Sequence, residues 1–313
     1  MLKVDRYDPS RADQWNRFVA TSRNGTFLFD RRYMDYHKNR FEDLSLVISK
    51  DDRIVALLPA NRGDGSTLYS HRGLTYGGLI VQPDMTTPLM LDIFAAMAPA
   101  LRDAAFAHMV YKTVPAIYRR TLGEDDLYAL ARVGATLLQR DTFSVIALDA
   151  PRTVQTRRKR GGAKARKTGV AISPAVALAD FWPVLEARLA ATHGATPVHS
   201  LDEIQRLQKS FPSNITVTAA VLDGEILAGL VLYDTGIVVR AQYIAASDRG
   251  QELGALDLLI QETCVRFESS RDYFDLGSSN AADGDGLNLG LIEFKEGFGA
   301  RTVAHDIYQW DFA

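Results

Sequence analysis

The strongest constraint on the fold is that the two halves of the chain show the same order of predicted elements. A β-rich run at residues 53–59 (Arg-Ile-Val-Ala-Leu-Leu-Pro) has a counterpart at 225–231 (Glu-Ile-Leu-Ala-Gly-Leu-Val). Each run follows another β-rich run and a polar turn, which indicates a hairpin. Around each hairpin the order is helices, hairpin, strand, helix, strand, helix and strand. The repetition predicts a duplicated mixed α/β domain, although two unrelated α+β domains would also produce it.

The spacing of apolar residues sets the individual elements in both halves. In the first half we expect helices at 11–21, 27–41, 87–107 and 124–134, strands at 3–6, 44–49, 54–59, 109–113 and 143–148, and a strand region interrupted by glycines at 68–81. In the second half we expect helices at 181–192, 201–211, 253–267 and 287–297, and strands at 215–222, 226–233, 237–246, 273–276 and 302–310. The fold class is therefore α/β, with a mixed sheet in each of two tandem domains.

The boundary between the domains is expected near Ala150, which gives domains at 1–150 and 151–313. A chain of 313 residues exceeds the usual size of one domain. Ala150 is followed by Pro151 and by the basic segment from Arg152 to Lys167, which contains no acidic residue. Because the rest of the chain is acidic, general nucleic-acid binding is disfavoured and no DNA partner is expected. The basic segment is better suited to a local phosphate group.

Several features bound the location and the chemistry. The single cysteine, Cys264, cannot form an internal disulfide, which fits a reducing compartment. The N-terminus lacks a signal-peptide pattern, and no apolar run is long enough to span a membrane. We therefore expect a cytoplasmic protein. The sequence contains no P-loop, no standard zinc motif and no Gly-x-Ser-x-Gly elbow, so no metal site is expected.

Three motifs carry a resemblance to a known superfamily. They are Tyr69-Ser-His-Arg-Gly-Leu-Thr-Tyr-Gly-Gly78, the basic segment with Lys164-Ala-Arg-Lys-Thr-Gly-Val170, and Phe274-Asp-Leu-Gly277 followed by Phe294-Lys-Glu-Gly-Phe-Gly299. With these motifs the chain resembles the tandem-domain branch of the GNAT superfamily over nearly its whole length. That branch includes the Fem peptidoglycan aminoacyltransferases and acyl-CoA-dependent N-acyltransferases. The first half is also similar to proteins that acylate nucleotide-linked amino sugars for surface polysaccharides such as lipopolysaccharide O-antigen.

The resemblance implies an acyl-CoA cosubstrate bound in the second half, where a strand leads into the helix at 253–267. Enzymes of the superfamily hold the pyrophosphate at such a junction, where loop and helix N–H groups converge. The corresponding residues here are Arg249, Gly250, Gln251, Gly254 and Ala255. The match is partial, because no Gly-x-Gly closes the loop and Glu252 adds a negative charge. A plain strand-to-helix turn is the alternative.

Three residues are the candidates for catalysis. In the Fem branch the lysine of the matching Phe-Lys pair lies in the reaction centre, which implies that Lys295 stabilises an oxyanion or moves a proton. Asp275 would accept a proton from the attacking ammonium or hold Lys295, and Tyr243 would act as general acid. Adjacent strand residues face opposite sides, so only one of Tyr243 and Gln242 can line the cleft, and we expect it to be Tyr243. The alternatives are an exposed lysine near a helix end, a loop-capping aspartate and a packed tyrosine.

Residues for the acceptor are expected in two places. Tyr69, His71, Arg72 and Tyr76 precede a Gly-Gly pair that permits close approach of a ligand to the backbone. A structural histidine is the alternative for His71. In the basic segment, Arg158 and Arg160 are candidates for diphosphate recognition; a solvated helix or a linker is the alternative there.

The sequence therefore predicts an N-acyltransferase that transfers an acyl group directly from acyl-CoA to a primary amine. The expected acceptor is a nucleotide-linked deoxyamino sugar. One rival is a Fem-type ligase that uses aminoacyl-tRNA and acts on a peptidoglycan precursor, which the acidic body of the chain disfavours. The other rival is a non-catalytic tandem domain that binds a nucleotide sugar or a protein. The oligomeric state stays open.

Overall fold

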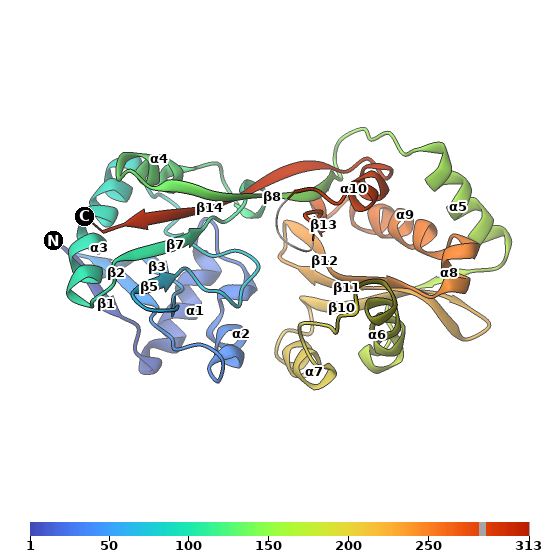
Figure 1. Cartoon of the computed structure of the whole chain (residues 1–313), viewed down its shortest axis with the longest axis horizontal. Coiled ribbons are helices and arrows are strands. Elements are labelled where there is room, and N and C mark those ends of the chain that lie inside the picture. The colour runs from blue at the N-terminus through green and yellow to red at the C-terminus, as the bar shows by residue number, and fades with distance from the viewer. Residues whose placement is uncertain (282–285, 313) are drawn as a thin grey trace. The chain divides into compact units, whose positions relative to one another are not determined.

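The chain folds into two compact units, and the computed structural model describes residues 1–281 and 286–312 (Figure 1). The first unit contains Met1–Asp141 and the C-terminal segment from Ala304; the second contains Thr142–Val303. Strands β8 (Thr136–Ala147) and β14 (Arg301–Asp311) therefore each have residues in both units. This division differs from the ranges 1–150 and 151–313, because the last strand ends in the first unit.

The first unit contains two groups of strands around one apolar core. Strands β1, β2, β3 and β6 pair in that order, and β4, β5 and β7 form the second group with β14. Helices α3 and α4 pack against the core through Phe94, Met97 and Leu130. The remaining bounds are β1 Leu2–Arg6, α1 Ala12–Thr21, α2 Arg31–Met34, β2 Leu46–Lys50, β3 Arg53–Leu58, β4 Asn61–Arg62, β5 Thr67–Tyr69, β6 Ile80–Val81, α3 Thr87–Asp103, β7 His108–Lys112 and α4 Asp125–Arg132.

The expected hairpin is confirmed in β2 and β3, whereas the expectation of one helix at 27–41 is wrong. Asp51 and Asp52 adopt φ of 50° and 63°, the left-handed conformation that two-residue hairpin turns require. The expected helix at 27–41 is broken, because Asp30 is extended and its side chain caps the short helix α2. The strand region expected at 68–81, interrupted by glycines, contains two short strands, β5 and β6, which belong to different sheets.

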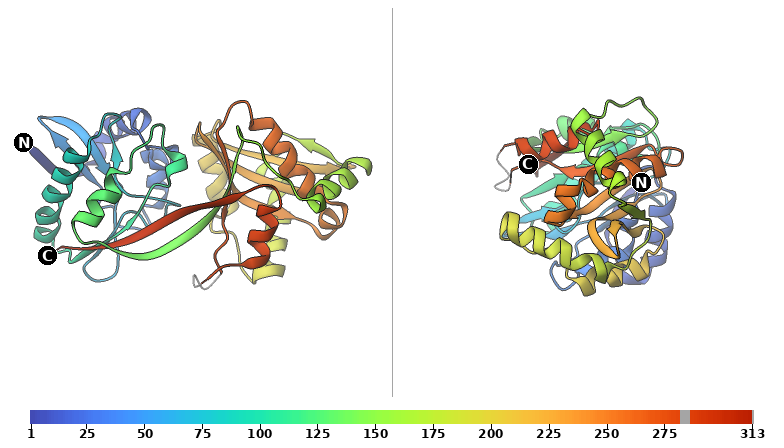
Figure 2. Two further views of the ribbon diagram at one scale, coloured as in Figure 1. Left: turned by 90° about the horizontal axis from the view of Figure 1, so that it is seen from above. Right: turned by 90° about the vertical axis from the view of Figure 1, so that its right-hand side faces the viewer.

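The second unit is a six-stranded sheet segment with helices on both faces. The strand order is β8-β13-β12-β11-β10-β9. Helices α5 and α9 cover one face, where Leu259 of α9 belongs to the same apolar core as Leu230 of the sheet. Helix α6 packs on the other face, where Phe181 contacts Gly229 (Figures 1 and 2). The bounds are α5 Thr156–Lys167, β9 Ala171–Ser173, α6 Leu178–His193, α7 Leu201–Ser210, β10 Ile215–Leu222, β11 Glu225–Asp234, β12 Val238–Ala246, α8 Asp248–Leu253, α9 Ala255–Phe267, β13 Tyr273–Ser278 and α10 Leu289–Glu296.

Strand β12 separates from β13 part-way along its length. Their parallel ladder joins Val238–Arg240 to Tyr273–Asp275, and in the described residues it ends there. On its other side β12 stays paired with β11 up to Ala246, with a bulge at Gln242. A bulge adds a residue to one strand and bends it. The last residues of β12 therefore have a backbone edge that β13 does not cover.

The helix expected at 253–267 is α9, which begins two residues later than expected, and a separate short helix, α8, precedes it. Ser247 caps α8 by accepting a hydrogen bond from the Gly250 N–H. Gly254 then turns the chain with φ of 76°, and α9 begins at Ala255. Among the helices that the structure describes, none is both long and apolar enough to cross a membrane.

Candidate active site

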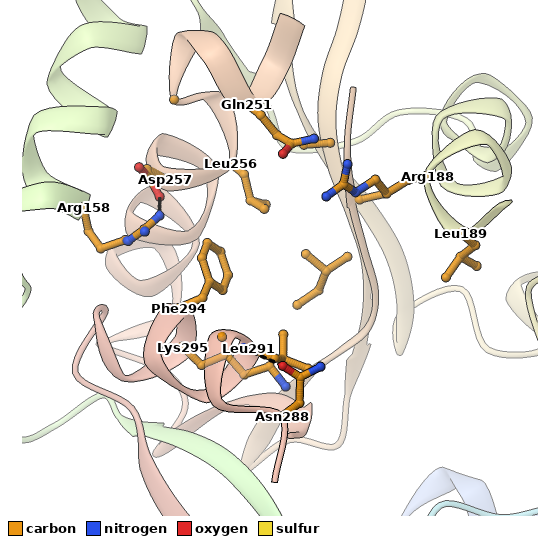
Figure 3. A pocket seen from close by; sticks show the side chains of 15 residues that line it. Arg158, Arg188, Leu189, Gln251, Leu256, Asp257, Asn288, Leu291, Phe294 and Lys295 are labelled. Carbon is orange, nitrogen blue, oxygen red and sulfur yellow. Dashed lines mark hydrogen bonds and ion pairs between the residues drawn. The ribbon is translucent and has the colours of Figure 1, made fainter. Parts of the chain in front are cut away.

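A pocket of about 650 Å³ lies in the second unit among helices α5, α6, α8, α9 and α10 and the end of β12. Its wall is mostly apolar, with three cationic side chains and one carboxylate. Figure 3 shows Gln251 at one end, Lys295 and Asn288 at the other, and Leu256 and Phe294 between them. The other lining residues are Arg158, Arg188, Leu189, Ile244, Ala245, Ala246, Gly254, Asp257, Gly290 and Leu291.

The N-terminus of α9 opens onto this pocket, because Gly254, Leu256 and Asp257 all line it. The first N–H groups of a helix have no acceptor within the helix and form its positive end. Gly254 permits the turn before them: it has φ of 76°, and a Cβ at this position would lie 2.4 Å from the carbonyl oxygen of Gly161. Ala255, the first residue of α9, is fully buried.

Lys295 lies at the other end of the pocket and is 3% exposed. Its Nζ donates hydrogen bonds to the carbonyl oxygens of Gly277, at 3.0 Å, and Ser278, at 2.5 Å. Burial lowers its pKa from 10.5 to about 8, an effect that Asp275 opposes and Arg240 reinforces. Two of the three N–H donors of the ammonium therefore have acceptors within residues 1–281 and 286–312, which leaves one for a ligand.

Asp275 is fully buried and does not line the pocket. Its Oδ2 accepts a hydrogen bond from Arg240, and its Oδ1 accepts one from the Gly277 N–H at 2.7 Å. Because the Gly277 carbonyl binds Lys295, Asp275 positions the backbone that holds the lysine. The contact with Arg240 was not anticipated from the sequence; a buried carboxylate needs a cationic partner, which was the available signal.

Arg158 connects three helices at the wall of the pocket. Its Nη1 donates to Asp257 Oδ1 at 2.6 Å, and its guanidinium lies 4.8 Å from the centre of the Phe294 ring. Burial raises the pKa of Asp257, against the effect of the Arg158 hydrogen bond and charge. Arg160 is exposed on α5 and does not line the pocket. The pair of predicted arginines is therefore divided between the pocket and the surface.

Tyr243 is not among the residues that line the pocket. Its hydroxyl accepts the backbone N–H of His199 at 3.1 Å and lies 2.6 Å from His199 Nδ1, and Trp182 packs edge-on against its ring. The alternation used to choose between Tyr243 and Gln242 does not hold, because Gln242 is a bulge residue. The lining residues on β12 are Ile244 to Ala246.

The residues predicted to bind the cofactor phosphates do not all face the pocket, because Arg249, Gly250 and Gln251 lie on different sides of the short helix α8. Gln251 and Gly254 line the pocket. Arg249 is exposed and pairs with Glu225. Gly250 is buried, and a Cβ there would lie 2.0 Å from the carbonyl oxygen of Leu227, so its lack of a side chain is explained by packing.

Tyr69 and Arg72 lie together in the first unit. The Arg72 guanidinium is 4.4 Å from the centre of the Tyr69 ring and 3.6 Å from the carboxylate of Asp64. The face of an aromatic ring attracts a guanidinium electrostatically. These two side chains therefore form one surface feature of the first unit.

His71 and Tyr76 are buried in the first unit. His71 is 5% exposed, has φ of 73°, and its Nδ1 accepts the N–H of Gly73 at 3.2 Å. Tyr76 is fully buried, and its hydroxyl donates to Thr26 Oγ1 at 3.1 Å. The following Gly77 has no room for a Cβ, which would lie 1.9 Å from the Ser70 carbonyl oxygen. Internal packing accounts for these positions.

Most of the residues that line the pocket were not predicted from the sequence, and the polar ones among them are Arg188, Asp257 and Asn288. Arg188 comes from α6, where one arginine in a helical pattern carries no functional signal. Asn288 is the N-cap of α10, and an asparagine before a helical pattern was the signal that could have placed it. Among the residues that the structure describes, no group of three or more His, Cys, Asp or Glu side chains is placed to hold a metal ion.

Solved structures share this fold at low sequence identity. FemX aligns over 99% of this chain and 97% of its own, with a TM-score of 0.72 and 12% identity. L-PGS from Bacillus licheniformis aligns over 96% and 91%, with a TM-score of 0.63 and 13% identity. A tandem GNAT protein from the clavulanic acid biosynthesis pathway aligns over 100% and 99%, with a TM-score of 0.55 and 14% identity.

No protein-family model matches the sequence, and no curated protein matches it significantly. The alignments with solved structures nevertheless extend over nearly the whole chain. The aligned residues therefore include both sheets of this chain and the helices on both faces of the second unit. The chain therefore has the tandem GNAT-like fold that FemX and the tandem GNAT protein share.

Proposed function

We propose that this protein is an acyltransferase that moves an acyl group from acyl-CoA to a primary amine. The observation that carries the proposal is that the N-terminus of α9 and Lys295 line one pocket. The first is suited to a phosphate group and the second to the oxygen of a thioester carbonyl. The apolar wall between them, with Leu256 and Phe294, suits the linking arm of coenzyme A (Figure 3).

The cofactor end of the pocket combines three kinds of donor. The first N–H groups of α9 supply the positive end of a helix, Gln251 supplies an amide, and Arg188 supplies a guanidinium. Asp257 is the unfavourable group for an anion, but its carboxylate is hydrogen-bonded to Arg158. The pair leaves little net negative charge facing the phosphates.

The uncovered edge of β12 supports an extended ligand beside it. Ile244, Ala245 and Ala246 line the pocket, and the ladder with β13 ends at Arg240. An open strand edge presents N–H and C=O groups that can pair with amides of an extended chain. The linking arm of coenzyme A contains such amides.

The proposed reaction end contains a buried cation. Since the pKa of Lys295 is about 8, the side chain is mostly protonated at pH 7 and its free N–H can stabilise a developing oxyanion. Cys264 is buried and burial raises its pKa to about 12, so no thiolate is available for an acyl-enzyme. Direct transfer to the amine is therefore the mechanism we favour.

For the acceptor we propose the amino group of a nucleotide-linked amino sugar. The support is the basic helix α5, on which exposed side chains are available for a diphosphate. They are Arg157, Lys159, Arg160 and Lys167. We place the reaction in the cytoplasm, where acyl-CoA and nucleotide sugars are available.

The test measures thiol release by the purified chain from acyl-CoA donors of graded length. Each donor is combined with primary amines, including nucleotide-linked amino sugars, and with no acceptor. We expect thiol release that depends on the acceptor and falls in Lys295→Met. No release with any pair would contradict the proposal. A parallel assay with labelled aminoacyl-tRNA tests the Fem-type alternative, which transfer from tRNA alone would favour.

A further inference from the structure

In the side-chain amide of Asn288, the oxygen Oδ1 takes part in a hydrogen bond with another described residue, whereas the nitrogen Nδ2 does not. Its Oδ1 accepts the N–H of Leu291 at 3.0 Å, which caps α10. Its backbone N–H donates to the carbonyl oxygen of Ser279 at 2.9 Å. Within the described part of the chain, Nδ2 has no hydrogen-bond acceptor. Because the amide is planar, the cap also fixes the direction of Nδ2.

Asn288 and Lys295 are anchored on consecutive residues at the end of β13. Lys295 Nζ binds the carbonyl oxygens of Gly277 and Ser278, and the Asn288 backbone binds Ser279. Both side chains line the same end of the pocket, as Figure 3 shows. The site therefore presents two kinds of N–H donor there, one from an ammonium and one from an amide.

We propose that Asn288 is a second catalytic residue, whose Nδ2–H donates a hydrogen bond to the oxyanion of the tetrahedral intermediate beside Lys295. This inference rests on the proposed acyl transfer. The amine nitrogen forms a bond to the thioester carbon, and the carbonyl electron pair moves to the oxygen. The intermediate then collapses, the C–S bond breaks, and the leaving thiolate accepts the proton that the amine loses, which yields an amide and coenzyme A.

Gly290 keeps space open next to this donor. It lines the pocket, and a Cβ at this position would meet only Asn288 Oδ1, at 3.8 Å. The lack of a side chain is therefore not required by packing within the chain. An open approach to the amide and to the first turn of α10 is what a reacting carbonyl oxygen needs.

Capping and catalysis use different atoms of Asn288, so they can be separated. Aspartate keeps a cap acceptor of the same shape and removes the N–H donor. We expect Asn288→Asp to keep the thermal stability and the KM for acyl-CoA, while kcat falls by about 10²–10³-fold. Asn288→Ser retains a cap without adding charge and is expected to lower kcat also.

A matched control places the same change at another helix cap. Thr86 caps α3 in the first unit, where its Oγ1 accepts the N–H of Leu89. Thr86→Asp adds the same charge at an N-cap outside the pocket, and we expect kcat to stay within twofold of the wild-type value. A similar fall in Thr86→Asp would overturn the inference, because charge or stability would then explain the effect.

The donor and acceptor that give the fastest wild-type turnover are used throughout. Wild-type kcat retained in Asn288→Asp and Asn288→Ser would overturn the role of Asn288 while leaving the proposed function in place. Absence of turnover in the wild-type protein with every pair would refute the proposed function, and this inference with it. Because the wild type is measured first, the two failures are distinguishable.

Discussion

Replacing Lys295 by methionine tests whether this lysine is a buried cation at the reaction centre. Methionine has a similar unbranched length but no charge, and it leaves the carbonyl groups of Gly277 and Ser278 without their donor. We expect kcat to fall by about 10²–10³-fold, the usual effect of removing one oxyanion donor. We also expect a change in stability that depends on pH in a defined direction.

The magnitude follows from the shift of the Lys295 pKa from 10.5 to about 8. Between these values the unfolded chain binds more protons than the native one, so the contribution of Lys295 to stability rises with pH. The burial penalty is fully present below pH 8 and is lost as pH rises toward 10.5. Between pH 7 and pH 10 the linkage relation gives a gain of about 2.5 kcal/mol for the wild type relative to Lys295→Met.

The assay is urea unfolding of both proteins at pH 7 and pH 10. Lys112, a part-buried lysine whose pKa desolvation lowers to about 8, titrates in both proteins, so the difference between them isolates Lys295. The carbonyl groups that lose their donor in Lys295→Met do not titrate. Their cost is therefore the same at pH 7 and pH 10, and it does not contribute to the change in the stability difference between the two pH values. A stability difference that stays constant from pH 7 to pH 10 would refute the argument that burial shifts this lysine.

Three further substitutions test the pocket and the contacts that support it. Gly290→Ala should raise the free energy of unfolding by about 1 kcal/mol through helix propensity and raise the KM for acyl-CoA; an unchanged KM would show that the position lies outside the binding path. Gly161→Ala should lower the thermal midpoint, because a Cβ there would lie 1.9 Å from Asp257 Oδ2; an unchanged midpoint would contradict the close α5–α9 contact. Asp275→Asn should cost about 3–5 kcal/mol in urea unfolding, because it removes the negative charge from the buried ion pair with Arg240; a loss under 1 kcal/mol would argue against the buried pair.

The elements of the second unit were predictable because their apolar patterns are long and regular. Strand β10 (Ile215–Leu222) has the expected bounds. The segment before Ala255 was less predictable, because a serine cap and a left-handed glycine create the short helix α8. The segment at 27–41 failed for a similar reason: Asp30 competes for backbone N–H groups through its side chain.

Site residues could be predicted from the sequence where a residue type is unusual for its position. They could not be predicted where the pairing of two strands determines which side chains meet. Lys295 follows a phenylalanine in the last turn of an apolar helix, and the structure places it in the pocket with Gln251 and Gly254. The partner of Asp275 could not be inferred, because Arg240 is brought to it by the register of two strands. The bulge at Gln242 likewise depends on pairing with β11, so the direction of Tyr243 was not available from alternation.

The central claim is that acyl-CoA lies in this pocket with its phosphates at the N-terminus of α9 and its thioester at Lys295. A crystal structure of the protein with coenzyme A tests it most directly. The account predicts the pyrophosphate beside Gly254 and Leu256 and the sulfur beside Lys295 and Asn288. Coenzyme A bound outside the pocket, or bound with its sulfur at the Gln251 end, would contradict the account.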